Sequence, residues 1–159
     1  MDGNNRCLGV WGHPLIVAGD AVVTYVERVN GRKDPYSGYP IGIGIEKDGK
    51  LIGGIVLHEF NGSNFYIHVA SDSPKRWVNR EWLHSIFSYA FDVAGARRIT
   101  GIVPESNEVA LRFDLDVGFE IEGRLADAHP KGDMLVIKMT RDNCKWIDYE
   151  RFPKPAARS

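Results

Sequence analysis

Three basic side chains are clustered near the middle of the chain: Lys75, Arg76 and Arg80. They stand at the start of segment 79–94, whose apolar residues recur at helical spacing and so predict an amphipathic helix. Cations at a helix N-terminus oppose the positive end of the helix dipole, and a bound anion would remove that conflict. The cluster therefore indicates a phosphate-binding turn, although a solvated basic turn would also explain it.

Two side chains upstream have the chemistry of a proton acceptor. His68 lies within a predicted strand, and its neighbours Ile67 and Val69 point to the opposite face. The ordinary pKa of histidine suits a base that takes a proton from an ammonium group. Glu59 ends the preceding strand and could do the same through a water molecule. Structural roles explain both residues too, because histidines in strands are more often structural and strand ends are commonly solvated.

Composition and charge bound the class of protein. With 159 residues, 43% apolar and 26% charged, the chain is predicted to form one soluble domain over residues 1–147, followed by a tail, 148–159. The formal net charge of −1 argues against recruitment to nucleic acid or to an anionic membrane. No apolar run reaches the roughly 18 to 20 residues that span a bilayer. Cys7 and Cys144 lack metal-ligand spacing, so we expect free thiols in the cytoplasm and no metal.

Periodicity and turn residues predict the order of the elements. In chain order these are a helix at 20–30, a loop at 31–40, a β-hairpin over 41–60 with its turn at Asp48-Gly49, strand 65–70 after a turn at Asn61-Gly62, helix 79–94, strand 98–103, helix 107–117, and two strands containing FEIEG and MLVIKMT. No regular element is assigned before residue 20. The pattern predicts a mixed α/β (α+β) domain whose central sheet is mostly antiparallel, with one parallel pair.

The segment NEVALRFDLDVGF, residues 107–119, resembles the helix with the pattern N-x-x-A and a final Gly-Phe that closes the core of GNAT-superfamily N-acetyltransferases. The elements on either side occur in the same order in that family, so the resemblance covers roughly residues 41–140. More narrowly, HVASDSP, RRITG and CKWI look like parts of short GNAT-like proteins encoded by phages and prophages. The resemblance implies a twisted sheet, flanked by helices and splayed open between strands 65–70 and 98–103.

The same resemblance implies that acetyl-CoA binds in the gap between those two strands. Its pyrophosphate would meet the N-terminus of helix 79–94, where unpaired N–H groups carry about half a positive charge. The implied or expected cofactor contacts are the backbone of Val69, Ala70 and Ser71, the cleft wall at Trp77, the basic cluster Lys75, Arg76 and Arg80, the helix cap Asn107, and Arg112, which either reaches the 3′-phosphate of CoA or lies in solvent.

The sequence departs from the family pattern at two places. Residues 75–80, KRWVNR, replace a glycine-rich pyrophosphate loop and contain no glycine, so side-chain charge would have to substitute for backbone donors. Asp114 stands where many relatives have the tyrosine that reprotonates the departing CoA thiolate. A carboxylate is a poor proton donor at pH 7 unless burial raises its pKa.

The function that the resemblance implies is direct transfer of an acetyl group from acetyl-CoA to a primary amine. Backbone N–H near Val69 would hold the oxyanion, with His68 or Glu59 as the base and Asp114 as the positional candidate for the acid. The acceptor is left open between a protein amine, a metabolite and a modified nucleobase.

One alternative is a binding module that kept the fold and lost the cofactor site. Another is a phage DNA-modifying or DNA-binding protein, supported only by the local basic clusters. Exposed strand edges in the C-terminal hairpin are compatible with a homodimer.

Overall fold

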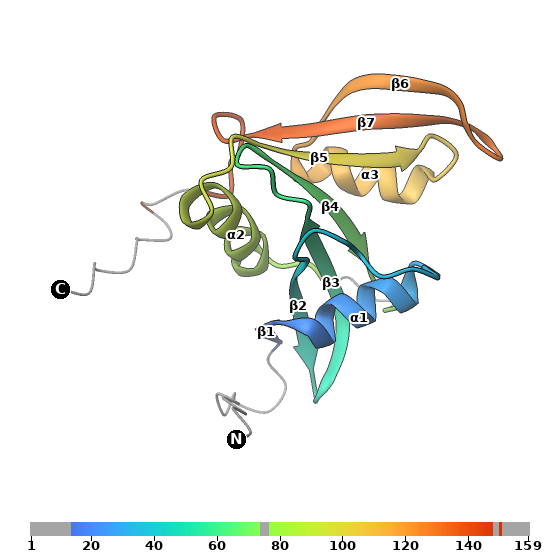
Figure 1. Ribbon diagram of the computed structural model, residues 1–159. Coiled ribbons are helices and arrows are strands. Elements are labelled where there is room, and N and C mark those ends of the chain that lie inside the picture. The colour runs from blue at the N-terminus through green and yellow to red at the C-terminus, as the bar shows by residue number, and fades with distance from the viewer. Residues whose placement is uncertain (1–13, 74–76, 148–149, 151–159) are drawn as a thin grey trace.

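The computed structural model describes residues 14–73, 77–147 and 150, which form a seven-stranded sheet with helices packed against it (Figure 1). The elements are β1 (Leu15–Ala18), α1 (Asp20–Val29), β2 (Ile41–Lys47), β3 (Lys50–His58), β4 (Asn64–Ala70), α2 (Arg80–Ser88), the π-helical turn η1 (Tyr89–Val93), β5 (Arg98–Pro104), α3 (Glu108–Val117), β6 (Glu120–His129) and β7 (Gly132–Thr140). The strands lie in the order β1-β2-β3-β4-β5-β7-β6. All neighbours are antiparallel except β4 and β5, which confirms the predicted fold class.

Two elements differ from the prediction. β1 is absent from the predicted elements, yet it pairs with β2 from Leu15 opposite Glu46 to Ala18 opposite Ile43. Four residues are too short a run for apolar alternation to stand out, so long-range pairing decides this strand. The predicted helix 79–94 is α-helical only as far as Ser88 and then widens into η1.

Helix α1 forms although its sequence is rich in β-branched residues. Val22, Val23 and Val26 are at most 7% exposed, because they share the face that packs on the sheet. A valine in a helix costs about 0.5 kcal/mol relative to alanine, whereas burying its side chain is worth about 1.5 kcal/mol or more. Tertiary packing therefore outweighs local propensity here.

The hairpin turn between β2 and β3 has the backbone conformation that its sequence predicts. Asp48 and Gly49 have φ values of 51° and 78°, both in the left-handed region. Aspartate tolerates that region and glycine adopts it freely, and consecutive positive φ values match the twist of the two strands. This turn sets the pairing of β2 with β3.

The sheet separates two apolar clusters. Along β3, Ile55 and Leu57 contribute to one cluster and Val56 to the other, as the alternation of a strand requires. Helix α2 buries Trp82 and Phe87 in the first cluster, whereas α1 packs into the second. The two helices therefore cover opposite faces of the sheet.

Strands β4 and β5 pair only at one end. The paired positions are Asn64 with Arg98, Phe65 with Ile99 and Tyr66 with Thr100. Beyond Tyr66 the two strands separate, and Gly101–Pro104 continues to pair with β7 on its other side. Figure 1 shows β5, β6 and β7 turning away from β4 together with α3. The splayed sheet implied by the sequence resemblance is thus confirmed.

Candidate active site

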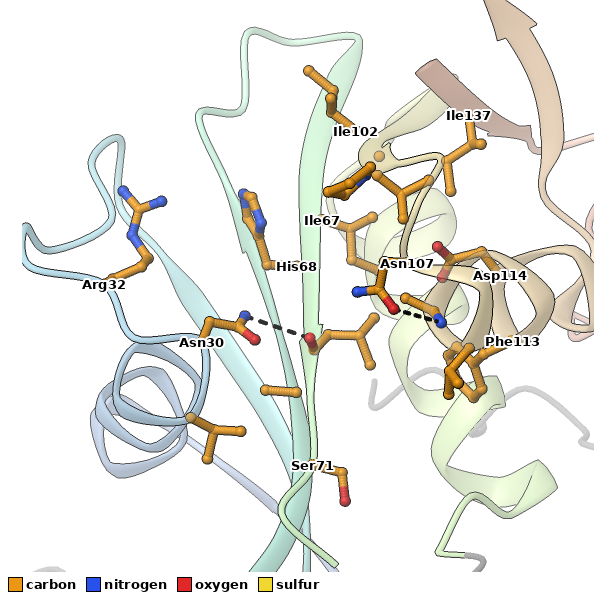
Figure 2. Close-up of a pocket in the computed structure, with 18 of the residues that line it drawn as sticks. Asn30, Arg32, Ile67, His68, Ser71, Ile102, Asn107, Phe113, Asp114 and Ile137 are labelled. Carbon is orange, nitrogen blue, oxygen red and sulfur yellow. Dashed lines mark hydrogen bonds between the residues drawn. The ribbon is translucent and has the colours of Figure 1, made fainter. Parts of the chain in front are cut away.

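A cleft of about 660 Å³ opens where β4 and β5 separate (Figure 2). Its walls are β4 and the residue after it, the outer half of β5, helix α3 and the segment that leaves α1. The described residues that line it are Val29, Asn30, Arg32, Tyr36, Ile67, His68, Val69, Ala70, Ser71, Trp77, Gly101, Ile102, Val103, Pro104, Asn107, Val109, Ala110, Phe113, Asp114 and Ile137. The split therefore gathers residues from elements that are distant in sequence.

The backbone of β4 is accessible from this cleft. No residue of β5 pairs with Ile67–Ala70, so the facing edge of β4 is not covered by a strand. The carbonyl of Val69 accepts a long hydrogen bond, 3.4 Å, from the side-chain amide of Asn30, which Figure 2 draws as a dashed line. Opposite this edge Gly101 has no side chain, and a Cβ there would lie 2.9 Å from Cγ1 of Ile137. An extended chain with amide groups would find room and backbone partners here.

His68 belongs to an aromatic cluster on one side of β4. Its ring centroid lies 4.7 Å from that of Tyr36 and 4.9 Å from that of His58. Burial, with His58 and Arg32 adding smaller effects, lowers the pKa of His68 to about 4. The ring is therefore neutral at pH 7 and can accept a hydrogen bond, but it is a weaker base than its ordinary pKa suggested.

His58, the third ring of this cluster, is 8% exposed. Neither of its ring nitrogens has a hydrogen-bond partner of normal geometry among the described residues. Burial lowers its pKa as well, although Glu59 and the backbone of Ser37 oppose the shift. The two histidines are thus both neutral, which allows their rings to pack against each other without charge repulsion.

Asp114 lies on the α3 wall, on the other side of the cleft from His68 (Figure 2). Burial alone raises the pKa of its carboxyl to about 7, from an ordinary value of 3.8. In the described part of the chain no ion pair or hydrogen bond holds the carboxylate form. About half of the molecules therefore carry a proton on Asp114 near neutral pH, which meets the condition for this residue to donate one.

Glu59, the second candidate base, lies outside the residues that line the cleft. Its Oε1 accepts a hydrogen bond of 2.7 Å from the Ser37 hydroxyl, and its side chain is exposed. It influences the cleft from a distance, because its charge raises the pKa of His68 against the larger effect of burial.

Of the basic cluster predicted at the start of α2, the structure describes Arg80, whereas Lys75 and Arg76 lie outside the described residues. Arg80 places its guanidinium carbon 5.8 Å from the ring centroid of Trp146 and is not among the cleft-lining residues. Asn79 caps the helix by accepting a hydrogen bond of 2.8 Å from the N–H of Trp82. The helix N-terminus is built as predicted, and its role with phosphate stays a prediction.

Trp77 links the start of α2 to the cleft. Its ring packs on Gly53 of β3, where an added Cβ would lie 2.2 Å from the indole Cε3. It meets Trp82 edge to face at 4.7 Å and lies nearly parallel to Phe113 at 6.4 Å. The expectation of Trp77 in a cleft wall agrees with this placement.

The two expected cofactor contacts on α3 lie in different surroundings. Asn107 lines the cleft and caps the helix, its Oδ1 accepting a hydrogen bond of 3.2 Å from the N–H of Ala110. Arg112 is exposed and does not line the cleft. Only Asn107 is therefore brought together with His68 and Asp114.

Sequence reasoning did not single out Asn30, Arg32 and Tyr36, which come from the end of α1 and the loop after it. A loop that precedes a core sheet often overhangs a cleft, but nothing local marks these three residues as facing β4. A cation followed four residues later by an aromatic residue is too common a pattern to carry that signal.

Three further features of the described residues concern metal, thiol and membrane chemistry. No group of three or more His, Cys, Asp or Glu side chains there is arranged to hold a metal ion. Cys144 is buried, which raises the pKa of its thiol to about 11 and makes it a poor nucleophile. Among the described helices none has the length and apolar character to cross a membrane.

Known proteins resemble this chain in structure but not detectably in sequence. No protein-family model and no curated protein sequence matches the chain. The spermidine N-acetyltransferase SpeG of Vibrio cholerae, solved as a point mutant, superposes with a TM-score of 0.65 over 86% of this chain and 98% of its own, at 14% identity. The same enzyme in complex with CoA and spermine gives 0.64 over 85% and 98%, at 15% identity.

A third solved structure is the N-acetyltransferase PseH of Campylobacter jejuni in complex with acetyl coenzyme A. It gives a TM-score of 0.51 over 74% of this chain and 76% of its own, at 15% identity. The structural similarities point to the same fold as the order of the seven strands and the separation of β4 from β5. The chain has the fold of the GNAT-superfamily N-acetyltransferases.

Proposed function

We propose that this protein transfers an acetyl group from acetyl-CoA to a primary amine by direct attack of the amine on the thioester. The observation that carries the proposal is the split between β4 and β5, which lets a donor and an acceptor approach one cleft from opposite sides of β4. On one side lie His68 and its aromatic neighbours, and on the other lie Asp114 and the N-terminus of α3 (Figure 2).

The residues present fit acetyl-CoA as a co-substrate. The uncovered backbone of Val69, Ala70 and Ser71 offers hydrogen-bonding groups to the amides of a pantetheine chain, and Asn107 lies across the cleft from it. The start of α2, with Trp77 before it, provides the positive end of a helix dipole for the pyrophosphate. When bound, the thioester supplies an activated acetyl group.

Three groups of the protein take part in the proposed reaction. A backbone N–H of β4 near Val69 holds the carbonyl oxygen as it gains negative charge. His68, neutral at pH 7, accepts a hydrogen bond from the attacking nitrogen. It then takes the proton of that nitrogen and passes it on to water. As the new C–N bond forms and the C–S bond breaks, Asp114 gives its proton to the departing sulfur and is reprotonated from solvent. Glu59, which lies outside the cleft, is the alternative base and would take the proton through water.

The test is calorimetric titration of acetyl-CoA and of CoA into the protein. We expect micromolar binding that the double variant Lys75→Ala/Arg80→Ala weakens at least tenfold, since two charge-assisted phosphate contacts are lost. The matched control is Lys47→Ala/Lys131→Ala, which removes the same charge from the exposed end of β2 and from an exposed turn. Absence of heat with both ligands would overturn the acetyltransferase proposal and favour a binding module that kept only the fold.

Three narrower expectations belong to the same proposal. We propose that the protein is one of the short GNAT-like proteins encoded by phages, acting in the host cytoplasm, on the strength of the sequence resemblance alone. We propose self-association through the exposed edge strand β6, in line with the solved structure of the Vibrio cholerae enzyme described as dodecameric. We also propose a domain that ends near residue 147, which sedimentation and limited proteolysis would check.

A further inference from the structure

Arg32 is the only cationic side chain among the described residues that line the cleft. Figure 2 shows it on the same side of β4 as His68, whereas Asp114 and Phe113 lie on the other side. It is therefore placed on the side from which, in the proposed reaction, the acceptor amine approaches.

The guanidinium of Arg32 is held in place by its neighbours. Its carbon lies 4.1 Å from the ring centroid of Tyr36, which is 4% exposed and so forms a fixed platform. Its Nε donates a hydrogen bond of 3.1 Å to the carbonyl of Asp34. The cation–π contact and this hydrogen bond orient the guanidinium of Arg32, which is otherwise exposed, before any ligand arrives.

No carboxylate in the described part of the chain forms an ion pair with Arg32. Two acidic residues near this cluster accept hydrogen bonds from other groups. Glu27 accepts a hydrogen bond of 2.9 Å from the N–H of Tyr36, and Glu59 accepts one of 2.7 Å from Ser37. Arg32 lowers the pKa of His68 and Glu59 raises it, and the effect of Arg32 is the larger of the two.

The same surroundings are unsuitable for a polycationic acceptor. Asp114 is the only carboxyl among the described cleft-lining residues, and it lies on the α3 wall. Among the described cleft-lining residues, the side that holds His68 therefore offers no carboxyl to an acceptor with several ammonium groups, and Arg32 repels such an acceptor. An anionic group on the acceptor would instead find the oriented guanidinium of Arg32.

We infer, resting on the proposed acetyl transfer, that the acceptor is a primary amine that also carries an anionic oxygen group, a carboxylate or a phosphate, which Arg32 binds while the amine meets His68. This makes Arg32 a determinant of specificity and separates the acceptor class from that of the polyamine acetyltransferases with the same fold.

The experiment follows acetyl-CoA consumption with matched pairs of amines. β-Alanine is compared with β-alaninamide, phosphoethanolamine with ethanolamine, and spermidine is added as the polycation. We expect kcat/KM for at least one acid-bearing amine to exceed that of its neutral partner by about 10- to 100-fold, as a charge-assisted hydrogen-bond pair allows. The pair with the larger ratio distinguishes a carboxylate from a phosphate.

Variants identify the residue responsible. Arg32→Gln removes the charge and should abolish the preference for the acid-bearing amine over its neutral partner. Arg32→Lys keeps the charge without the planar guanidinium donors and should retain part of that preference. Lys33→Gln removes the neighbouring charge from a residue that does not line the cleft and serves as the control. Acetyl-CoA affinity, measured by calorimetry, should change by less than about threefold in all three.

The outcomes separate this inference from the proposed function. No binding of acetyl-CoA by the unaltered protein means that acetyl transfer itself is wrong. Binding of acetyl-CoA together with equal turnover of charged and neutral amines, preferred turnover of spermidine, or no transfer to any acid-bearing amine overturns the anionic-acceptor inference alone. Loss of acetyl-CoA affinity on Arg32→Gln would assign this side chain to the cofactor phosphates instead.

Discussion

His68 and Asp114 lie on opposite walls of one cleft, and burial shifts the pKa values of their side chains in opposite directions, to about 4 and about 7. Burial disfavours the charged form of each, so at neutral pH the histidine is neutral and the carboxyl is about half protonated. One low-dielectric environment thus produces a hydrogen-bond acceptor on one wall and a proton donor on the other. Titratable pairs whose environments shift them in this way are typical of acid–base sites.

Replacing Asp114 by Asn should lower kcat about a hundredfold or more while acetyl-CoA affinity stays nearly unchanged, because only the proton donor is lost. The unaltered protein should also lose kcat as pH rises above about 7, where the acid form disappears. Asp114→Tyr should move that limb toward about pH 10, the ordinary pKa of a phenol. Steady-state rates from about pH 6 to 10 check this, and Asp116→Asn on the exposed side of α3 is the control. Full activity of Asp114→Asn would remove the residue from the mechanism.

The raised pKa of Asp114 also predicts how stability varies with pH. Between about pH 4 and pH 7 the folded state keeps this proton while the unfolded state releases it, so the free energy of unfolding falls as pH rises. Asp114→Asn abolishes that loss. Relative to the unaltered protein the variant should gain on the order of 2 kcal/mol from about pH 4 to pH 8. Urea denaturation at both pH values measures the change, and a difference independent of pH would contradict the assigned burial.

The lowered pKa of His68 predicts the opposite slope. Its folded-state pKa of about 4 lies below the ordinary 6.5, so the unfolded state binds a proton first as the solution is acidified. The stabilisation is complete above about pH 7 and is lost as pH falls from about 6.5 toward 4, by on the order of 2 kcal/mol. His68→Phe keeps the ring packing on Tyr36 without titrating, and should lose less stability over that window. Parallel stability curves for the two proteins would show that the ring is not buried as described.

Gly53→Ala should displace Trp77, since the new Cβ would lie 2.2 Å from its ring. We expect a loss of about 1 to 3 kcal/mol in the free energy of unfolding, typical of overpacking, with a change in tryptophan fluorescence and weaker acetyl-CoA binding. Gly123→Ala is the matched control, because its nearest neighbour would be 3.9 Å away. Unchanged fluorescence and affinity in Gly53→Ala would mean that Trp77 packs elsewhere.

Much of the fold follows from local sequence patterns. The Asp48-Gly49 turn, the cap at Asn107 and the apolar face of α2 each depend on residues close together in the chain, and each is found where it was predicted. The strand β1 was not predicted, because the pairing of Leu15 with Glu46 involves a partner outside the local pattern, and the π-helical end of α2, which buries Phe91, was not predicted either.

The candidate site divides in the same way. The sequence by itself determined which residue types were available, including the histidine in β4, the aspartate on α3 and the basic turn before α2. Only the tertiary structure decided that His68 and Asp114 face one cleft, that Glu59 does not line it, and that Arg32 and Tyr36 do. The reason is physical: most of the strands and helices follow from patterns among neighbours in sequence, whereas burial, and with it the pKa of each side chain, depends on which distant elements the sheet brings together.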